Sequence, residues 1–309
     1  MTNQIFKTRI LKIVVLLFYT GICVKGIGQT KYFILEDGNN KFETLTYKLN
    51  ANSLYKVDRE VMLFNLMTKV NTVIGEGGIY NGQSDYNITL FSVLPDLSGK
   101  EDWFKIALDT VRSSIIDFAK LEEIGIKSSL SFSNNIAKET TKYFNEYKII
   151  VKRGDEYFTP KYCLLQFYSV RNRPHVFTNV YGTINTQDSA ISVLSFEKIF
   201  KNAYPSLPFP LYRIGEEPHS SLEWSRDRKE YFSKKLSLAN KMIGYQFWTY
   251  IDWTQPKIKY DFERGIDRFV YLPGKGIIGG SFDFYFYFNR KKLPIKYTDF
   301  LNNIKEERV

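Results

Sequence analysis

The chain has 309 residues, with 43 basic and 33 acidic side chains and a formal net charge of +10. Its two histidines and two cysteines supply few ligands for zinc, and no pair of them has ligand spacing, so we expect no metal site. The basic residues are spread along the chain and not gathered in one stripe, which argues against a nucleic-acid-binding protein.

The first predicted element is an export signal. A basic stretch precedes an apolar run at residues 13–24, and small side chains stand at Gly28 and two residues before it. Twelve helical residues span about 18 Å, which is short of the roughly 30 Å hydrocarbon core of a bilayer. The pattern therefore predicts a signal peptide cleaved after Gly28. Ile22 before Cys23 argues against a lipoprotein, and an uncleaved anchor is the alternative.

Two small residues flank Ile27, and Gln29 follows directly. This pattern resembles the signal peptides of Bacteroidetes-type Gram-negative bacteria. The resemblance covers the leader only. The mature chain, residues 29–309, keeps a surplus of six basic residues and a single cysteine, Cys163, so an internal disulfide is impossible. Cys163 lies in a strand-like run, and we expect a buried, inert thiol. We predict an exported protein, periplasmic or extracellular, with no transmembrane segment in its mature chain.

Four elements are expected before residue 125. Residues 31–49 predict a hairpin around a turn at 37–40, residues 58–74 a helix, and residues 85–94 a strand. A capping box at Ser98 then begins a helix that Gly125 ends. The apolar face of this helix is expected to comprise Phe104, Leu108, Val111, Ile115 and Phe118.

Strand patterns dominate from residue 147 onward. Residues 147–158 predict a second hairpin with Gly154 and Asp155 in its turn, so the Arg-Gly-Asp tripeptide there is interpreted as a turn and not as an adhesion motif. Another helix is expected from near Ser225 to Gly244, with Phe232, Leu236, Ala239 and Ile243 on one face. Further strands are expected at residues 161–170, 175–184, 189–196, 245–253, 257–263, 268–272 and 280–288.

The order of these elements indicates the fold class. Helices and strands do not alternate regularly, which argues against a doubly wound parallel sheet. The sequence predicts an α+β fold, with a largely antiparallel mixed sheet and two or three amphipathic helices packed on it. Residues 29–309 are interpreted as a single α+β domain, and the alternative is two intimate halves that meet near residues 125–147.

A cluster at the end of one predicted strand is the first candidate site. Arg171, Arg173 and His175 place two guanidinium groups and one imidazole within five residues. Arginine pairs bind phosphate or carboxylate groups through bidentate hydrogen bonds. A solvated turn before Pro174 explains the same residues, so both interpretations stay open.

The second candidate site is the segment 204–224, in which four prolines exclude a regular helix. It carries Glu216, Glu217 and His219, which are weak candidates for a general acid and base because adjacent side chains usually point in different directions. Trp224 and Arg226 follow. Together with the arginine–histidine cluster, they form the predicted ligand or partner surface.

Two hypotheses of function remain. The favoured one is a secreted or periplasmic, non-catalytic binding or interaction protein of the bacterial cell envelope, with a protein or glycan partner and no cofactor. The alternative is a secreted glycan hydrolase that uses two carboxylates, one of them Glu216 or Glu217. In that case Trp224, Trp248 and Trp253 would serve as platforms for sugar rings.

Overall fold

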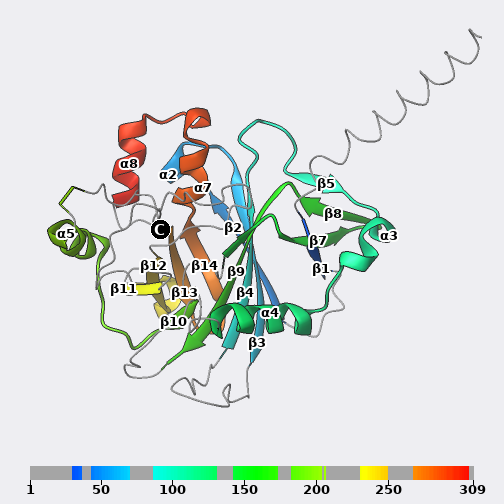
Figure 1. Cartoon of the computed structure of the whole chain (residues 1–309), viewed down its shortest axis with the longest axis horizontal. Coiled ribbons are helices and arrows are strands. Elements are labelled where there is room, and N and C mark those ends of the chain that lie inside the picture. The colour runs from blue at the N-terminus through cyan, green and yellow to red at the C-terminus, as the bar shows by residue number, and fades with distance from the viewer. Residues whose placement is uncertain are drawn as a thin grey trace, which may run out of the picture.

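The computed structural model places the described residues in three β-sheets with a few helices (Figure 1). It describes residues 30–36, 43–69, 86–130, 142–172, 182–203, 205–206, 230–249 and 267–305. Most strand pairs in these ranges are antiparallel. The predicted mixed α+β class is therefore confirmed.

The central sheet joins strands from both halves of the chain. Its strand order is β10-β9-β4-β3-β2, and β6 pairs with the same edge of β9 as β10 does. Only β10 runs parallel to its neighbour among these pairs. The bounds are β2 Glu43–Asn50, β3 Glu60–Lys69, β4 Tyr86–Leu94, β6 Lys142–Phe144, β9 Tyr162–Arg171 and β10 Thr183–Asn185.

Two four-stranded sheets flank the central one (Figure 1). The first has the order β1-β7-β8-β5, and the second is the antiparallel meander β11-β12-β13-β14. Strands of the first are β1 Tyr32–Glu36, β5 Trp103–Lys105, β7 Tyr147–Arg153 and β8 Glu156–Pro160. Strands of the second are β11 Glu230–Ser237, β12 Ile243–Thr249, β13 Asp267–Leu272 and β14 Gly276–Ser281.

The helices are short, and they cover the sheets. Helix α4 (Phe118–Leu130) packs on the core next to the first flanking sheet, whereas α5 (Val193–Ala203) and α8 (Tyr297–Lys305) pack on the core next to the meander. None of the helices in the described ranges is long and apolar enough to cross a membrane. The other bounds are α2 Asn52–Tyr55, α3 Leu108–Val111 and α7 Asp283–Phe288.

The central sheet is buried on both faces. On β9, Leu164 and Tyr168 belong to the core that the meander covers, whereas Cys163 and Leu165 belong to the core under the other flanking sheet. Alternate residues of a strand point to opposite faces, so one strand supplies both cores. The two cores therefore share one sheet.

The predicted strands at 85–94, 161–170 and 268–272 are confirmed as β4, β9 and β13. The hairpin at 147–158 is also confirmed, because Arg153 pairs with Glu156 across a turn in which Gly154 has φ +61°. Cys163 is buried, as expected.

The predicted hairpin at 31–49 is wrong in its pairing. Both strands form, but β1 pairs in parallel with β7, whereas β2 pairs with β3 in the central sheet. The sequence Asp-Gly-Asn-Asn at residues 37–40 permits a tight turn but does not require one. The longer-range apolar contacts of Phe33 and Ile34, which are buried in different clusters, favour the flanking sheet.

The predicted helix at 58–74 is wrong, because residues 60–69 form strand β3. Leu63 and Leu66 lie on opposite faces of a sheet that is buried on both sides. A strand with two buried faces has an almost continuous apolar sequence, which a helical pattern also fits.

The long helix expected after Ser98 is replaced by β5, α3, a 3₁₀ turn and α4. Ser98 donates its hydroxyl hydrogen bond to Asp96 at 2.7 Å and forms no helix cap. Phe104, expected on the buried face, is 43% exposed. Gly125 lies inside α4 and does not end it, and a Cβ at this position would lie 2.5 Å from the ring of Phe167.

Three further elements change type. The helix expected from Ser225 is β11 and β12 in its described part, with Gly244 inside β12. The strand expected at 189–196 runs into α5, and the strand expected at 280–288 ends at Ser281 before α7. In α7 the phenylalanine and tyrosine side chains from Phe284 to Tyr287 are all buried, so their alternation does not separate a buried from an exposed face.

Asn65 joins the central sheet to the meander. Its side-chain amide donates to the carbonyl of Ile277 at 2.9 Å, and its Oδ1 accepts from the Ile277 N–H at 2.7 Å. Gly276 has φ +75°, and a Cβ there would lie 2.7 Å from Oδ1 of Asn65. The close approach of the two sheets therefore requires glycine at this position.

Replacing Asn65 with alanine is expected to lower the free energy of unfolding by about 2 kcal/mol, because a buried N–H and a buried carbonyl of Ile277 lose their partners. Urea unfolding followed by tryptophan fluorescence measures this change. Asn202→Ala on the exposed face of α5 is the control, and it should leave the unfolding curve unchanged. Equal curves for both variants would contradict the role of Asn65.

Candidate functional site

A buried ion pair lies where β6 meets the meander. Lys142 is the first residue of β6, and Asp267 is the first residue of β13. The Lys142 Nζ lies 3.0 Å from Oδ2 of Asp267, and the two side chains are only 1% and 6% exposed. Charges removed from water remain stable in a protein only when they are paired or hydrogen-bonded. The pair therefore connects the central sheet to the meander at the cost of desolvating two charges.

A second buried ion pair lies directly beside the first. Arg268 Nη1 lies 2.7 Å from Oδ2 of Asp283, and both side chains are at most 2% exposed. The hydroxyl of Tyr55 donates to Oδ1 of Asp283 at 2.6 Å, and it accepts from the Phe282 N–H at 2.9 Å. Arg268 also donates to the carbonyl of Ile304 in α8. One carboxylate thus holds α2, β13 and α7 together.

Burial raises the pKa of Asp283 to about 6, although the neighbouring charge of Arg268 lowers it. The hydrogen bond from Tyr55 also lowers this pKa, whereas the negative charge of Asp267 raises it. The Asp283 carboxyl is therefore about half ionised near pH 6. Such perturbed carboxyls gather at functional sites, and they also occur in structural ion-pair networks.

Glu230, the first residue of β11, is the third buried carboxyl of this cluster. Burial raises its pKa to about 8, against the charge of Lys142 and the backbone N–H groups of Gly182 and Thr183. Within the described residues, its Oε2 has no hydrogen-bond partner. Burial also raises the pKa of Tyr168, which faces the charges of Glu230 and Asp267. We call Lys142, Glu230, Asp267, Arg268 and Asp283 the buried charged cluster.

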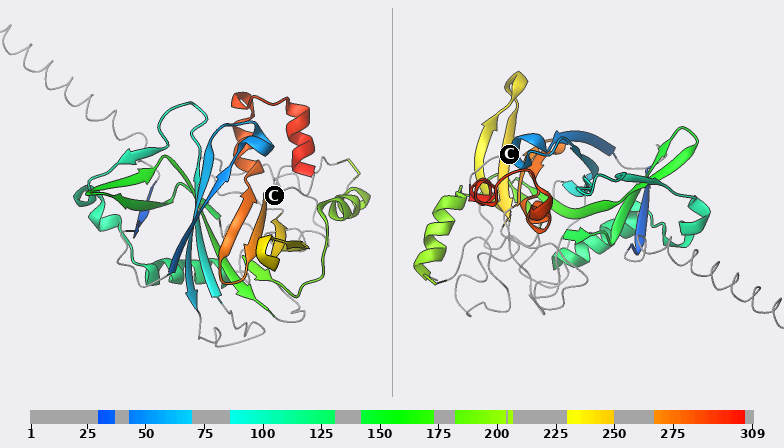
Figure 2. Two further views of the ribbon diagram at one scale, coloured as in Figure 1. Left: turned by 180° about the vertical axis from the view of Figure 1, so that it is seen from behind. Right: turned by 90° about the horizontal axis from the view of Figure 1, so that it is seen from above.

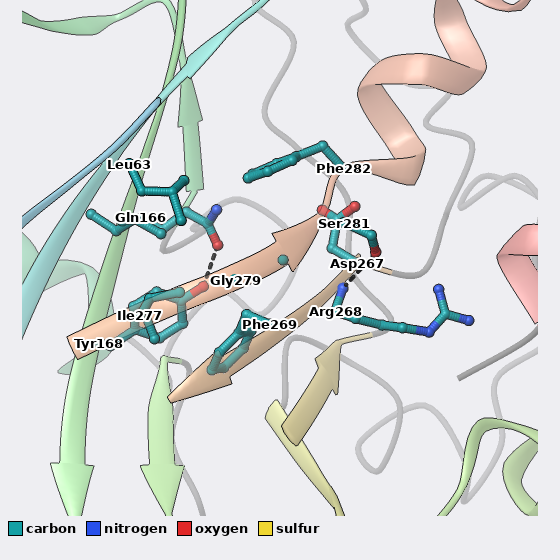
Figure 3. Close-up of a pocket in the computed structure, with 12 residues that line it drawn as sticks. Leu63, Gln166, Tyr168, Asp267, Arg268, Phe269, Ile277, Gly279, Ser281 and Phe282 are labelled. Carbon is teal, nitrogen blue, oxygen red and sulfur yellow. Dashed lines mark hydrogen bonds between the residues drawn. The ribbon is translucent and has the colours of Figure 1, made fainter. Parts of the chain in front are cut away.

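A small cavity adjoins this cluster (Figure 3). Asp267, Arg268 and Ser281 line one side, and the Ser281 Oγ accepts from the Arg268 N–H at 3.2 Å. On the other side, the Tyr168 hydroxyl donates to the amide oxygen of Gln166. The cavity has space for about one water molecule. A sugar ring or a nucleotide does not fit there.

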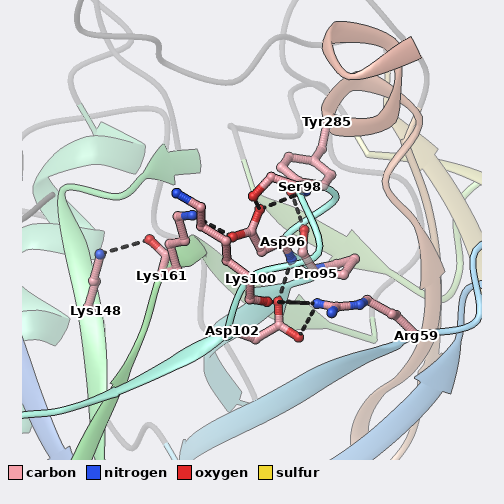
Figure 4. Close-up of polar contacts among 9 residues, drawn as sticks. All are labelled: Arg59, Pro95, Asp96, Ser98, Lys100, Asp102, Lys148, Lys161 and Tyr285. Atoms are coloured by element: carbon pink, nitrogen blue, oxygen red, sulfur yellow. Dashed lines mark hydrogen bonds and ion pairs between the residues drawn. The ribbon is translucent and has the colours of Figure 1, made fainter. Parts of the chain in front are cut away.

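A second polar network lies where Tyr285 of α7 meets the connection between β4 and β5 (Figure 4). Asp96 accepts hydrogen bonds from Ser98 and pairs with Lys161, while Nη1 of Arg59 lies 2.8 Å from Oδ2 of Asp102. Burial raises the pKa of Asp96, but the hydrogen bonds from Lys161 and Ser98 lower it by more than burial raises it. The resulting pKa is about 2. The Tyr285 hydroxyl donates to the carbonyl of Pro95. This network holds the connection between β4 and β5 in place.

Two features limit the chemistry available in the described ranges. No group of three or more histidine, cysteine, aspartate or glutamate side chains is arranged there to hold a metal ion. Cys163 is fully buried, and burial raises the pKa of its thiol to about 12 despite the positive charge of Lys148. A thiol with this pKa is neutral at physiological pH and is a poor nucleophile.

Most of the site residues predicted from sequence lie outside the described residues. These are Arg173, His175, Glu216, Glu217, His219, Trp224 and Arg226. Arg171 is described at the end of β9, where it is 8% exposed, and its backbone carbonyl accepts from the Thr186 N–H at 3.2 Å. The predicted ligand surface and the weak catalytic candidates therefore remain predictions.

Sequence reasoning missed the buried charged cluster. Asp283 stands inside the run FDFYFYF, where a lone carboxylate among aromatic residues was a usable signal. Glu230 and Asp267 are each the first residue of a strand, which is a weaker signal because charges often stand at strand ends. Their meeting with Lys142 depends on contacts between strands that are up to 125 residues apart in the sequence.

Comparison with known proteins gives no relative of this chain. No family model, no curated protein and no solved structure matches it.

Proposed function

We propose that this chain is an exported, non-catalytic binding protein of the bacterial cell envelope. The observation that carries the proposal is the buried charged cluster, in which the charges of Lys142 and Arg268 neutralise carboxylates inside the protein. The adjoining cavity accepts about one water molecule. These features support a structural role for the cluster and contacts with partners through the outer surface.

The export part of the proposal rests on the leader. The short apolar run and the small residues before Gln29 favour cleavage after Gly28 and delivery across the inner membrane. The mature chain would then meet membranes, glycans and other envelope proteins, and its modest basic surplus suits anionic partners.

The rival is a glycan hydrolase with two carboxylates. Its best support within the described residues is Asp283, whose pKa of about 6 suits a proton donor beside the carboxylate of Asp267. Asp283 is, however, held by Arg268 and Tyr55, and the cavity lined by the neighbouring Asp267 and Arg268 has space for only about one water molecule. Glu216 or Glu217 would have to supply an acid from outside the described residues.

The test uses the chain produced with its leader in a Gram-negative host. We expect mass spectrometry to show a mature form that begins at Gln29, and this form to sediment with the envelope fraction without releasing soluble sugar. The variants Glu216→Gln and Glu217→Gln should sediment as the parent does.

Sugar release by the parent that either glutamine variant abolishes would overturn the binding proposal in favour of the hydrolase, since only proton transfer is lost in these variants. A parent that stays soluble in the presence of envelope would overturn it as well.

A further inference from the structure

The hairpin of β11 and β12 projects from the body of the protein (Figure 2). Its strands pair from Glu230–Thr249 at the base to Ser237–Ile243 near the tip. Asn240 and Lys241 both have φ +60° in the turn. The neighbouring strand β13 pairs with β12 only as far as Tyr245, so the tip extends beyond the sheet.

On one face of this hairpin, β12 carries apolar side chains past the end of the core, opposite Lys235 and Ser237 of β11. Phe232 and Phe247 are paired at its base and are buried in the core. Tyr245 and Ile243 continue the same face, because alternate residues of a strand share a side. Ile243 is 48% exposed, and Met242 beside it is 39% exposed. The two aliphatic side chains are therefore partly exposed to water near the projecting end of the hairpin.

The same tip is basic. Residues 231–249 contain three lysines and no aspartate or glutamate. Lys235 and Lys241 are exposed, and the Lys235 Nζ lies 5.8 Å from the centre of the Tyr245 ring. The turn at 273–275 follows β13 at this end of the sheet and adds Lys275, which is also exposed. The tip thus combines exposed aliphatic groups with positive charge.

We propose that this hairpin tip binds the anionic surface of a phospholipid bilayer. Met242 and Ile243 enter the boundary between headgroups and acyl chains, while Lys235, Lys241 and Lys275 contact lipid phosphates. Apolar groups flanked by lysines are the composition of interfacial membrane-binding segments. The proposal rests on the proposed function and names one partner of the exported chain.

An acidic glycan is the competing partner for the lysines, but it offers nothing apolar to Met242 and Ile243. A second copy of the chain would bring the same lysines to the contact, and like charges repel. The pairing of exposed aliphatic side chains with positive charge therefore favours lipid.

The experiment measures binding to vesicles by flotation. Vesicles of phosphatidylglycerol mixed with phosphatidylcholine should bind the mature chain, vesicles of phosphatidylcholine alone should bind it weakly, and high salt should release it. Met242→Ser combined with Ile243→Ser should weaken binding at least about tenfold, because the aliphatic contacts are lost. Each of Lys235→Gln and Lys241→Gln should weaken it roughly fivefold.

The matched control is Phe104→Ser combined with Lys152→Gln, which removes an exposed aromatic side chain and an exposed lysine from the other flanking sheet. This variant should bind vesicles as the parent does. All variants change exposed residues, so their thermal unfolding curves should match that of the parent.

Three results would overturn the membrane proposal. The first is equal vesicle binding by the parent and the Met242–Ile243 variant. The second is release of the parent from vesicles by a soluble acidic glycan but not by salt. The third is a dimer of the parent in light scattering that the Met242–Ile243 variant does not form. A parent that sediments with envelope but does not bind vesicles overturns the hairpin proposal alone. A parent that does neither overturns the proposed function too.

Discussion

Replacing Asp283 with alanine is expected to lower the free energy of unfolding by about 3–5 kcal/mol, the cost of removing one partner from a buried ion pair. The variant leaves the Arg268 guanidinium buried without its counter-charge, and it also removes the acceptor of the Tyr55 hydroxyl. Urea unfolding of the mature chain near pH 7 measures the loss. Asp283→Asn should cost less than alanine, because its amide oxygen can still accept from Tyr55.

Two controls separate the charge effect from a packing effect. The double variant Arg268→Met with Asp283→Leu removes both charges, and it should recover most of the stability lost in Asp283→Ala. Asp109→Asn breaks an exposed pair with Arg112, whose side chains are 86% and 80% exposed, and should change stability by less than about 0.5 kcal/mol. A loss below about 1 kcal/mol in Asp283→Ala would contradict the desolvated pair.

The strand positions that could be predicted from sequence share one property. In β9 and β13, β-branched and aromatic residues form runs that are too short for a helix and are bounded by turn residues. The β7–β8 hairpin was predictable for the same reason, since Gly154 and Asp155 match a two-residue turn. Local chemistry decides these elements, and tertiary contacts agree with it.

The elements that were predicted wrongly are those in which tertiary burial overrides local pattern. Strand β3 packs Leu63 on one core and Leu66 on the other, so its sequence loses the alternation that identifies a half-exposed strand. Helix α7 has the opposite problem. Its alternating aromatic residues resemble a strand, yet all of them up to Tyr287 are buried: Phe286 packs on Tyr55, Tyr287 on Phe300 of α8, and Tyr285 on Tyr162 of β9.

The buried charged cluster was beyond sequence reasoning for a topological reason. Lys142 and Asp267 are 125 residues apart and meet only because β6 pairs with β9 while the meander covers the same core. A single sequence does not report such pairings. Asp283 alone offered a local signal in the sequence, although it was missed. A carboxylate inside a run of aromatic residues needs a buried partner wherever the run lies in the fold.

The stability of the protein is expected to fall as the pH rises from 5 to 8, and Glu230 is expected to cause on the order of 3 kcal/mol of this fall. The pKa of Glu230 is raised from 4.5 to about 8 in the folded protein, chiefly by burial. Between these two pKa values the folded protein holds a proton that the unfolded chain has released. Raising the pH in this window therefore lowers the free energy of unfolding.

Other carboxyls act at lower pH. Burial raises the pKa of Asp283 to about 6, so its contribution has the same sign but is complete near that pH. The pKa of Asp96 is lowered to about 2, and its contribution is present above its ordinary pKa and lost as the pH falls through 2. The interval from pH 6.5 to pH 8 therefore isolates Glu230 among these three groups.

The variant Glu230→Gln is neutral at every pH and close in shape to protonated glutamate. It should match the parent within about 1 kcal/mol at pH 5 and exceed it by on the order of 4 kcal/mol at pH 8. Urea unfolding at pH 5, 6, 7 and 8 gives the difference curve. Glu156→Gln at an exposed pair with Lys105 is the control, and its difference from the parent should not change over this range. Parallel curves for parent and Glu230→Gln would mean that Glu230 is ionised in the folded protein, with Lys142 as its counter-charge.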